Sequence, residues 1–91
     1  LSIKIEKPVN GDFIDKDFSV RAIINSSNEI KNVEVYLNNK LISQRSGSFG
    51  PEYIYQENFN LNNIKSQNIL KIKATDNNNK EIREEIIIYS R

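Results

Sequence analysis

One stretch of the chain, Ile30–Ile42, most strongly limits what the protein can fold into. Apolar residues occupy every second position of its first half: Val33, Val35 and Leu37. This is the period-two pattern of a β-strand with one buried face. The pair Asn38-Asn39 follows, and asparagine enters the left-handed backbone region more readily than most residues other than glycine. The stretch therefore predicts a β-hairpin that turns at the two asparagines.

The same alternation recurs along the rest of the chain, and turn residues separate the alternating segments. The expected strands, besides the hairpin, are Ser2–Val9, Phe18–Ile24, Tyr53–Leu61, Leu70–Thr75 and Ile82–Tyr89. Turn signals arrive about every 8–15 residues, and no segment sustains the 3.6-residue period of a helix. No helix is expected beyond, at most, a short turn at Ile64–Ser66. This pattern predicts an all-β, antiparallel immunoglobulin-like β-sandwich of about seven strands.

The first segment contains Pro8, which cannot donate a hydrogen bond to a neighbouring strand. We therefore expect an edge strand that breaks at Pro8, and Phe13 and Ile14 can restart that edge. The alternation also predicts the core residues, which are Phe18, Val20, Ala22, Val33, Val35, Leu37, Leu70, Ile72, Ile86 and Ile88. Tyr53 and Tyr55 should line the core edge, with their hydroxyls reaching loop backbone.

Three isoleucines, Ile23, Ile54 and Ile87, fall on the outward parity of their segments. They can form a patch for a neighbouring module, or they can be covered by lysine stems and loops. Both readings stay open at the level of sequence.

Size and charge narrow the class of protein. The 91 residues suit a single domain, residues 1–91. The 13 basic and 12 acidic residues give a net charge of +1 and form no basic block, which argues against nucleic-acid binding. The longest aliphatic run, Ile86–Ile88, is too short to span a membrane. Because the chain opens at Leu1 and stops on a strand-like segment, we expect a module excised from a longer protein.

The chain contains neither cysteine nor histidine. It therefore lacks the usual ligands of zinc, haem and iron–sulfur clusters, and it lacks every catalytic triad that uses those residues. No glycine-rich phosphate cradle is present either. These observations predict a protein that is not an enzyme and carries no cofactor, and they leave oxygen-ligated cations such as calcium as the only metals to consider.

Aspartates gather at one corner of the sequence: Asp12, Asp15 and Asp17. Together with Asp76 from the late turn they could supply oxygen ligands to calcium. The alternative is that they cap turns and stay solvated, and Asp76 in particular suits a turn cap. Their spacing matches no EF-hand loop. We expect no metal site here and no calcium requirement for folding, with these four residues as the candidates if one exists.

Two aromatic residues are candidates for contact with a glycan. Tyr36 falls on the polar parity of its strand, and Phe49 lies in a glycine-containing loop, Gln44–Glu52. An exposed aromatic ring offers a flat apolar surface on which a sugar can stack. Single exposed apolar residues are also common on surfaces without any function.

Four segments carry a resemblance to a known family. They are Ile5–Gly11, Ile30–Asn38, Gly50–Tyr55 and Lys73–Asn77, in that order. They resemble the bacterial immunoglobulin-like domains that occur in tandem on secreted and cell-surface proteins, including glycoside hydrolases, adhesins and penicillin-binding proteins. Asn39 and Asn79 stand where that family usually has glycine. Ser66 and Asn68 stand where many members have a glycine and a tyrosine that forms a corner.

The resemblance implies a non-catalytic accessory or spacer module of an exported or cell-surface bacterial protein, one that positions neighbouring domains. Its partners would be those neighbouring domains and, as an alternative function, a cell-wall or other polysaccharide. A calcium-stabilised adhesin module is a further alternative.

Overall fold

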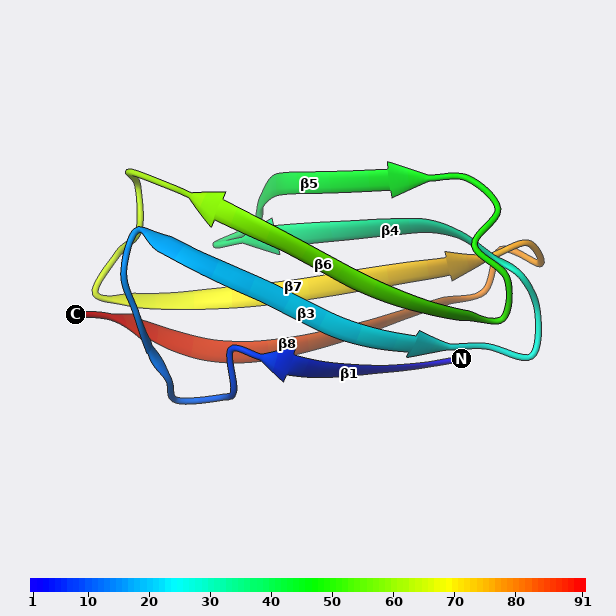
Figure 1. Ribbon diagram of the computed structural model, residues 1–91, viewed down its shortest axis with the longest axis horizontal. Coiled ribbons are helices and arrows are strands. Elements are labelled where there is room, and N and C mark those ends of the chain that lie inside the picture. The colour runs from blue at the N-terminus through cyan, green and yellow to red at the C-terminus, as the bar shows by residue number, and fades with distance from the viewer.

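The computed structural model describes residues 1–91 and contains eight β-strands and no helix. The strands are β1 (Ser2–Lys7), β2 (Phe13–Ile14), β3 (Asp17–Asn25), β4 (Ile30–Leu37), β5 (Lys40–Ser46), β6 (Glu52–Asn60), β7 (Gln67–Asp76) and β8 (Glu81–Ser90). They form a three-stranded sheet of order β1-β3-β6, which faces a five-stranded sheet of order β2-β8-β7-β4-β5 (Figure 1). The predicted β-sandwich is confirmed, with a short extra strand at the early edge.

That early edge changes sheets at a proline. β1 pairs with β3 and ends at Lys7, and the following Lys7–Pro8 peptide bond is cis. The chain then crosses to the other sheet, where Phe13 of β2 lies opposite Tyr89 of β8. The predicted break at Pro8 and restart at Phe13 are confirmed. Because the chain keeps its direction while it changes sheets, β2 runs parallel to β8, and it is the one parallel pair in an otherwise antiparallel fold.

The hairpin turns where the sequence predicts. Asn38 and Asn39 have φ angles of 52° and 68°. A two-residue type I′ hairpin turn requires positive φ at both positions. Asn79 has a φ of 63° in the turn before β8. Asparagine therefore does at these turns what glycine does in the resembling family.

The core fills the space between the two sheets. The buried apolar residues are Ile3, Ile14, Val20, Ala22, Ile24, Ile30, Val33, Val35, Leu37, Tyr55, Phe59, Leu70, Ile72, Ala74 and Ile88. Most predicted core residues belong to this set. Phe18 and Ile86 do not, because each is half-buried and packs against the margin of the core. Phe18 stacks there on Phe59, with 5.6 Å between ring centroids.

The three outward isoleucines lie on two different sheets. Ile23 and Ile54 are opposite each other on β3 and β6, whereas Ile87 is opposite Ile69 on β7. The hypothesis that Ile23, Ile54 and Ile87 form one patch is therefore wrong. Alternation fixes which residues point outward, but it does not say which sheet carries them.

An arginine joins the two sheets along the side where β5 and β6 are both edge strands. The Arg45 guanidinium donates hydrogen bonds to the Tyr53 hydroxyl at 2.9 Å, to the Gln56 carbonyl at 2.7 Å and to the Glu57 carboxylate at 2.9 Å. It also lies 4.4 Å from the centre of the Tyr55 ring, a cation–π distance. Side chains thus close a side of the sandwich that no backbone ladder closes.

Burial disfavours the charged forms of both Arg45 and Tyr55, so by itself it lowers the pKa of the arginine and raises the pKa of the tyrosine. It disfavours the charge of Arg45, but hydrogen bonds to Tyr53 and Glu57 outweigh that effect and raise the pKa of Arg45. Burial raises the pKa of Tyr55 to about 12, and its hydroxyl donates to Glu57 at 3.3 Å. The expectation that the hydroxyls of Tyr53 and Tyr55 reach loop backbone is wrong, because Tyr53 accepts its bond from Arg45 on the facing edge β5 and Tyr55 donates to Glu57 on its own strand, β6.

Replacing the buried Ile72 by alanine should lower the free energy of unfolding by about 2–4 kcal/mol, because it removes apolar contacts and leaves a cavity. Ile72 is 0% exposed, whereas Ile54 is 45% exposed, so Ile54→Ala is the matched control and should change stability by less than about 1 kcal/mol. Urea unfolding measures both. Equal shifts of the two midpoints would contradict the assigned core.

Candidate functional site

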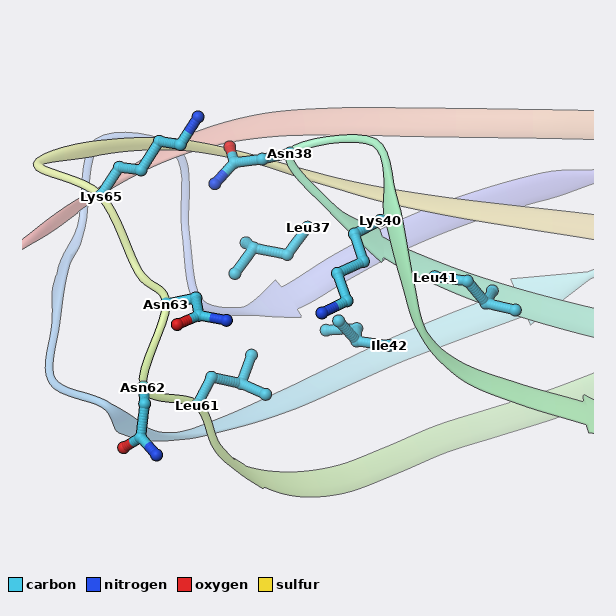
Figure 2. Close-up of a pocket in the computed structure, with 9 residues that line it drawn as sticks. All are labelled: Leu37, Asn38, Lys40, Leu41, Ile42, Leu61, Asn62, Asn63 and Lys65. Carbon is cyan, nitrogen blue, oxygen red and sulfur yellow. The ribbon is translucent and has the colours of Figure 1, made fainter.

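A single pocket of about 420 Å³ opens at one end of the sandwich. It lies between the tip of the β4–β5 hairpin and the loop that joins β6 to β7 (Figure 2). The lining residues are Leu37, Asn38, Lys40, Leu41, Ile42, Leu61, Asn62, Asn63 and Lys65. The set combines aliphatic side chains, carboxamides and amines, and it contains no carboxylate.

The side chains that line the pocket divide into those that enter it and those that do not. Figure 2 shows Leu37, Ile42 and Leu61 extending into the space, where they continue the apolar core toward solvent. Lys40 enters from the hairpin and Asn63 from the facing loop, so both polar ends are directed into the space. Asn62, Lys65 and Leu41 point away from it.

A buried asparagine holds the two walls of the pocket together. The Asn68 side-chain oxygen accepts hydrogen bonds from the Lys65 amide at 2.8 Å and from the Asn38 carboxamide at 3.0 Å. Its nitrogen donates to the Lys65 carbonyl at 2.8 Å. Asn38 in turn accepts a bond from the Ile69 amide at 2.9 Å. Asn68 therefore connects the loop, the hairpin and β7 at the position where the resembling family places a tyrosine.

At the other end of β7, Asp76 has a matching role. Its carboxylate accepts hydrogen bonds from the backbone amides of Asn78 at 2.9 Å and Lys80 at 3.0 Å, and the Asn28 carboxamide lies at 3.5 Å. Burial works to raise the pKa of Asp76, but these hydrogen bonds together outweigh it and lower the pKa below its ordinary value. The interpretation of Asp76 as a turn cap is confirmed.

The structure disperses the four aspartates named as metal candidates. Asp12 accepts a hydrogen bond from the Val9 amide at 2.9 Å, and Asp17 accepts one from the Asn60 carboxamide at 2.6 Å. Asp15 lies 3.6 Å from the Arg91 guanidinium. Asp76 lies at the opposite end of the sandwich from these three (Figure 1). No three carboxylates converge anywhere in the chain.

The two candidate glycan contacts are also apart. Tyr36 lies near the end of β4, with the Lys71 amine 4.8 Å from its ring centre. Phe49 stacks on Tyr53 with centroids 4.3 Å apart, and its amide bonds to Ile30 at the start of β4. The intervening strand spans about 20 Å, so one small sugar cannot touch both rings.

An aromatic pair that sequence reasoning did not single out is more open to solvent. Phe13 is 61% exposed, and its ring centroid is 5.7 Å from that of Tyr89. The pair forms because β2 joins the sheet beside β8. The pocket residues were missed for a related reason: they come from segments that only the fold brings together.

The arrangement of sheets defines the fold as an immunoglobulin-like β-sandwich, and a comparison with solved structures supports this. The chain is similar to a structure described as "Structures of Clostridium thermocellum CbhA fibronectin(III)-like modules", with a TM-score of 0.74 and 21% sequence identity. The match covers 98% of this chain and 94% of that one. No family model and no curated protein matches the sequence. No helix is present that could cross a membrane.

Replacing Asn68 by alanine should destabilise the protein by about 1–3 kcal/mol, since it leaves the Lys65 backbone groups and Asn38 without their buried partner. Asn58 bonds only to Ser19, at an exposed site, so Asn58→Ala is the control and should change stability by less than about 1 kcal/mol. Amide hydrogen exchange should also speed up in the β6–β7 loop of Asn68→Ala. Unchanged exchange there would show that Asn68 does not hold the loop.

The lowered pKa of Asp76 predicts sensitivity to acid. Because the folded pKa lies below the unfolded value of 3.8, the ionised carboxylate stabilises the fold above that value, and this contribution is lost as the pH falls through the folded pKa. Asp76→Asn cannot titrate, so its stability should differ less between pH 7 and pH 3 than that of the unaltered protein. Asp15→Asn, at an exposed site, is the control. Denaturant unfolding at both pH values measures the difference, and an equal acid loss in Asp76→Asn would contradict the prediction.

Proposed function

We propose that this chain is a non-catalytic spacer module of an exported or cell-surface bacterial protein, and that it holds its neighbouring domains at a fixed separation. The observation that carries the proposal is the placement of the termini. Leu1 and Arg91 lie at opposite ends of the long axis (Figure 1), and the domain measures 39 × 19 × 18 Å. A domain inserted in this way adds its length to the distance between its neighbours.

Two further observations support the proposal. The structural neighbour is itself described as one of several modules of CbhA. Four segments, in the same order along the chain, resemble bacterial immunoglobulin-like domains. Those domains occur in tandem on secreted and surface proteins, so the resemblance also supports an accessory module.

The physical advantage of such a module is a fixed distance rather than a long reach. A flexible chain of the same length would have a root-mean-square end-to-end distance of about 50 Å with a broad distribution. The folded domain has a largest dimension of only 39 Å. Folding therefore exchanges some average length for a narrow distribution of distances and directions.

A carbohydrate-binding module is the second candidate, favoured by the exposed Phe13 ring, which packs beside the half-buried Tyr89. Affinity electrophoresis over soluble polysaccharides separates the two functions. Retardation that disappears in Phe13→Ala or Tyr36→Ala would favour the sugar-binding function, and mobility independent of the polysaccharide would favour the spacer.

The spacer function predicts a narrow distance distribution. The chain should be inserted between two copies of a rigid reporter domain, each with one spin label, and compared with a Gly/Ser linker of equal length. Pulsed electron spin resonance should give one narrow peak for the folded module and a broad distribution for the linker. A distribution as broad as that of the linker would contradict the proposal.

A further inference from the structure

The pocket between the β4–β5 hairpin and the β6–β7 loop has features that spacing does not require. We propose that it binds an apolar carboxylate, meaning a small apolar body that ends in a carboxylate group. This activity goes beyond the spacer function, and either can hold without the other.

The charge of the lining favours an anion. The polar side chains come from two lysines and three asparagines, and no acidic residue contributes. Neither Lys40 nor Lys65 takes part in an ion pair within the chain. Lys40 is the one whose amine points into the space, with the Asn63 carboxamide opposite it (Figure 2). An ammonium group only donates hydrogen bonds, so its complement is an acceptor, and a carboxylate is the strongest common one.

The apolar side chains of the pocket narrow the class of ligand further. Leu37, Ile42 and Leu61 extend into the pocket around the two polar groups. A fully hydrated anion such as phosphate would leave this surface exposed to water, whereas an apolar body would cover it and gain the transfer free energy. The volume of about 420 Å³ lies within the range of small-ligand pockets.

The pocket is also formed before any ligand arrives. Asn68 bonds to the loop through Lys65 and to the hairpin through Asn38, so both walls are fixed to the buried strand β7. Binding therefore costs little ordering of the protein, and a small ligand can be held by few contacts.

The same chemistry has two sources: a free medium-chain acid, or the carboxyl end of a peptide whose last residue is apolar. Four probes distinguish them. Octanoate represents the free acid and octanol is its uncharged counterpart, while N-acetyl-leucine represents the chain end and its amide is the uncharged counterpart. Titrations of the isotope-labelled protein are followed by amide chemical shifts in nuclear magnetic resonance.

At least one acid should produce saturable shifts centred on Leu37, Lys40 and Asn63, with a dissociation constant on the order of 1 mM. Its uncharged counterpart should bind at least about threefold more weakly. Lys40→Gln should weaken binding of the acid by about two- to fivefold, the range expected for one exposed ion pair. Lys4→Gln removes the same charge from β1 in the other sheet and should leave the affinity unchanged. Asn63→Phe places a ring in the space and should abolish binding, whereas the outward-facing Asn62→Phe should not.

Saturation by octanoate alone assigns the free acid as the ligand, and saturation by N-acetyl-leucine assigns a chain end. The proposal is overturned if neither acid gives shifts at the pocket. Equal binding of an acid and its uncharged counterpart, or equal loss in Lys40→Gln and Lys4→Gln, overturns it as well. The spacer function is judged separately by the distance distribution, which does not depend on these variants.

Discussion

The inner face of β7 is the constraint on which the rest of the structure depends. Its inward residues are Asn68, Leu70, Ile72, Ala74 and Asp76, and all are buried. β7 lies between β4 and β8, so the three apolar residues at its centre sit in the middle of the core. The two polar residues stand where the core meets the loops at either end. One strand thus combines the hydrophobic contacts of the sandwich with the hydrogen bonds that fix both ends.

Because Asn68 and Asp76 are buried, their need for hydrogen-bond partners orders the adjacent loop and turn. A buried amide or carboxylate destabilises a fold unless its hydrogen bonds are made, and no buried side-chain polar atom of this chain lacks a partner. The partners of Asn68 and Asp76 are chiefly backbone groups of the adjacent loop and turn. Those segments must therefore adopt one conformation for the core to be satisfied. The pocket walls are rigid because the hydrogen bonds of Asn68 fix both the loop and the hairpin.

The sequence was most informative where structure follows from neighbouring residues. Alternation predicted the strands and most of the core, and Asn38-Asn39 predicted the hairpin turn. It was less informative where strands distant in sequence meet. The hydrogen bond between Asn68 and Asn38 joins residues far apart in the chain, and no local sequence pattern predicts it. The placement of Ile87 on a different sheet from Ile54 depends on strand order, which alternation leaves open. For the same reason, Asp76 was grouped with aspartates at the opposite end.

Side chains and a short strand cover parts of the sheet edges, whereas the pocket lies at one end of the sandwich. Arg45 closes the side between β5 and β6 with side-chain bonds, and the change of sheet after β1 brings β2 beside β8 on the other side. A covered edge resists pairing with a strand of another molecule. The pocket, by contrast, opens at the end where the Ser90 amide bonds to Ser66 of the β6–β7 loop. No C-terminal residue lines the pocket, but the β6–β7 loop contributes to the pocket wall and also bonds to the end of β8. The pocket and the C-terminal end of β8 are therefore both attached to the loop that Asn68 fixes.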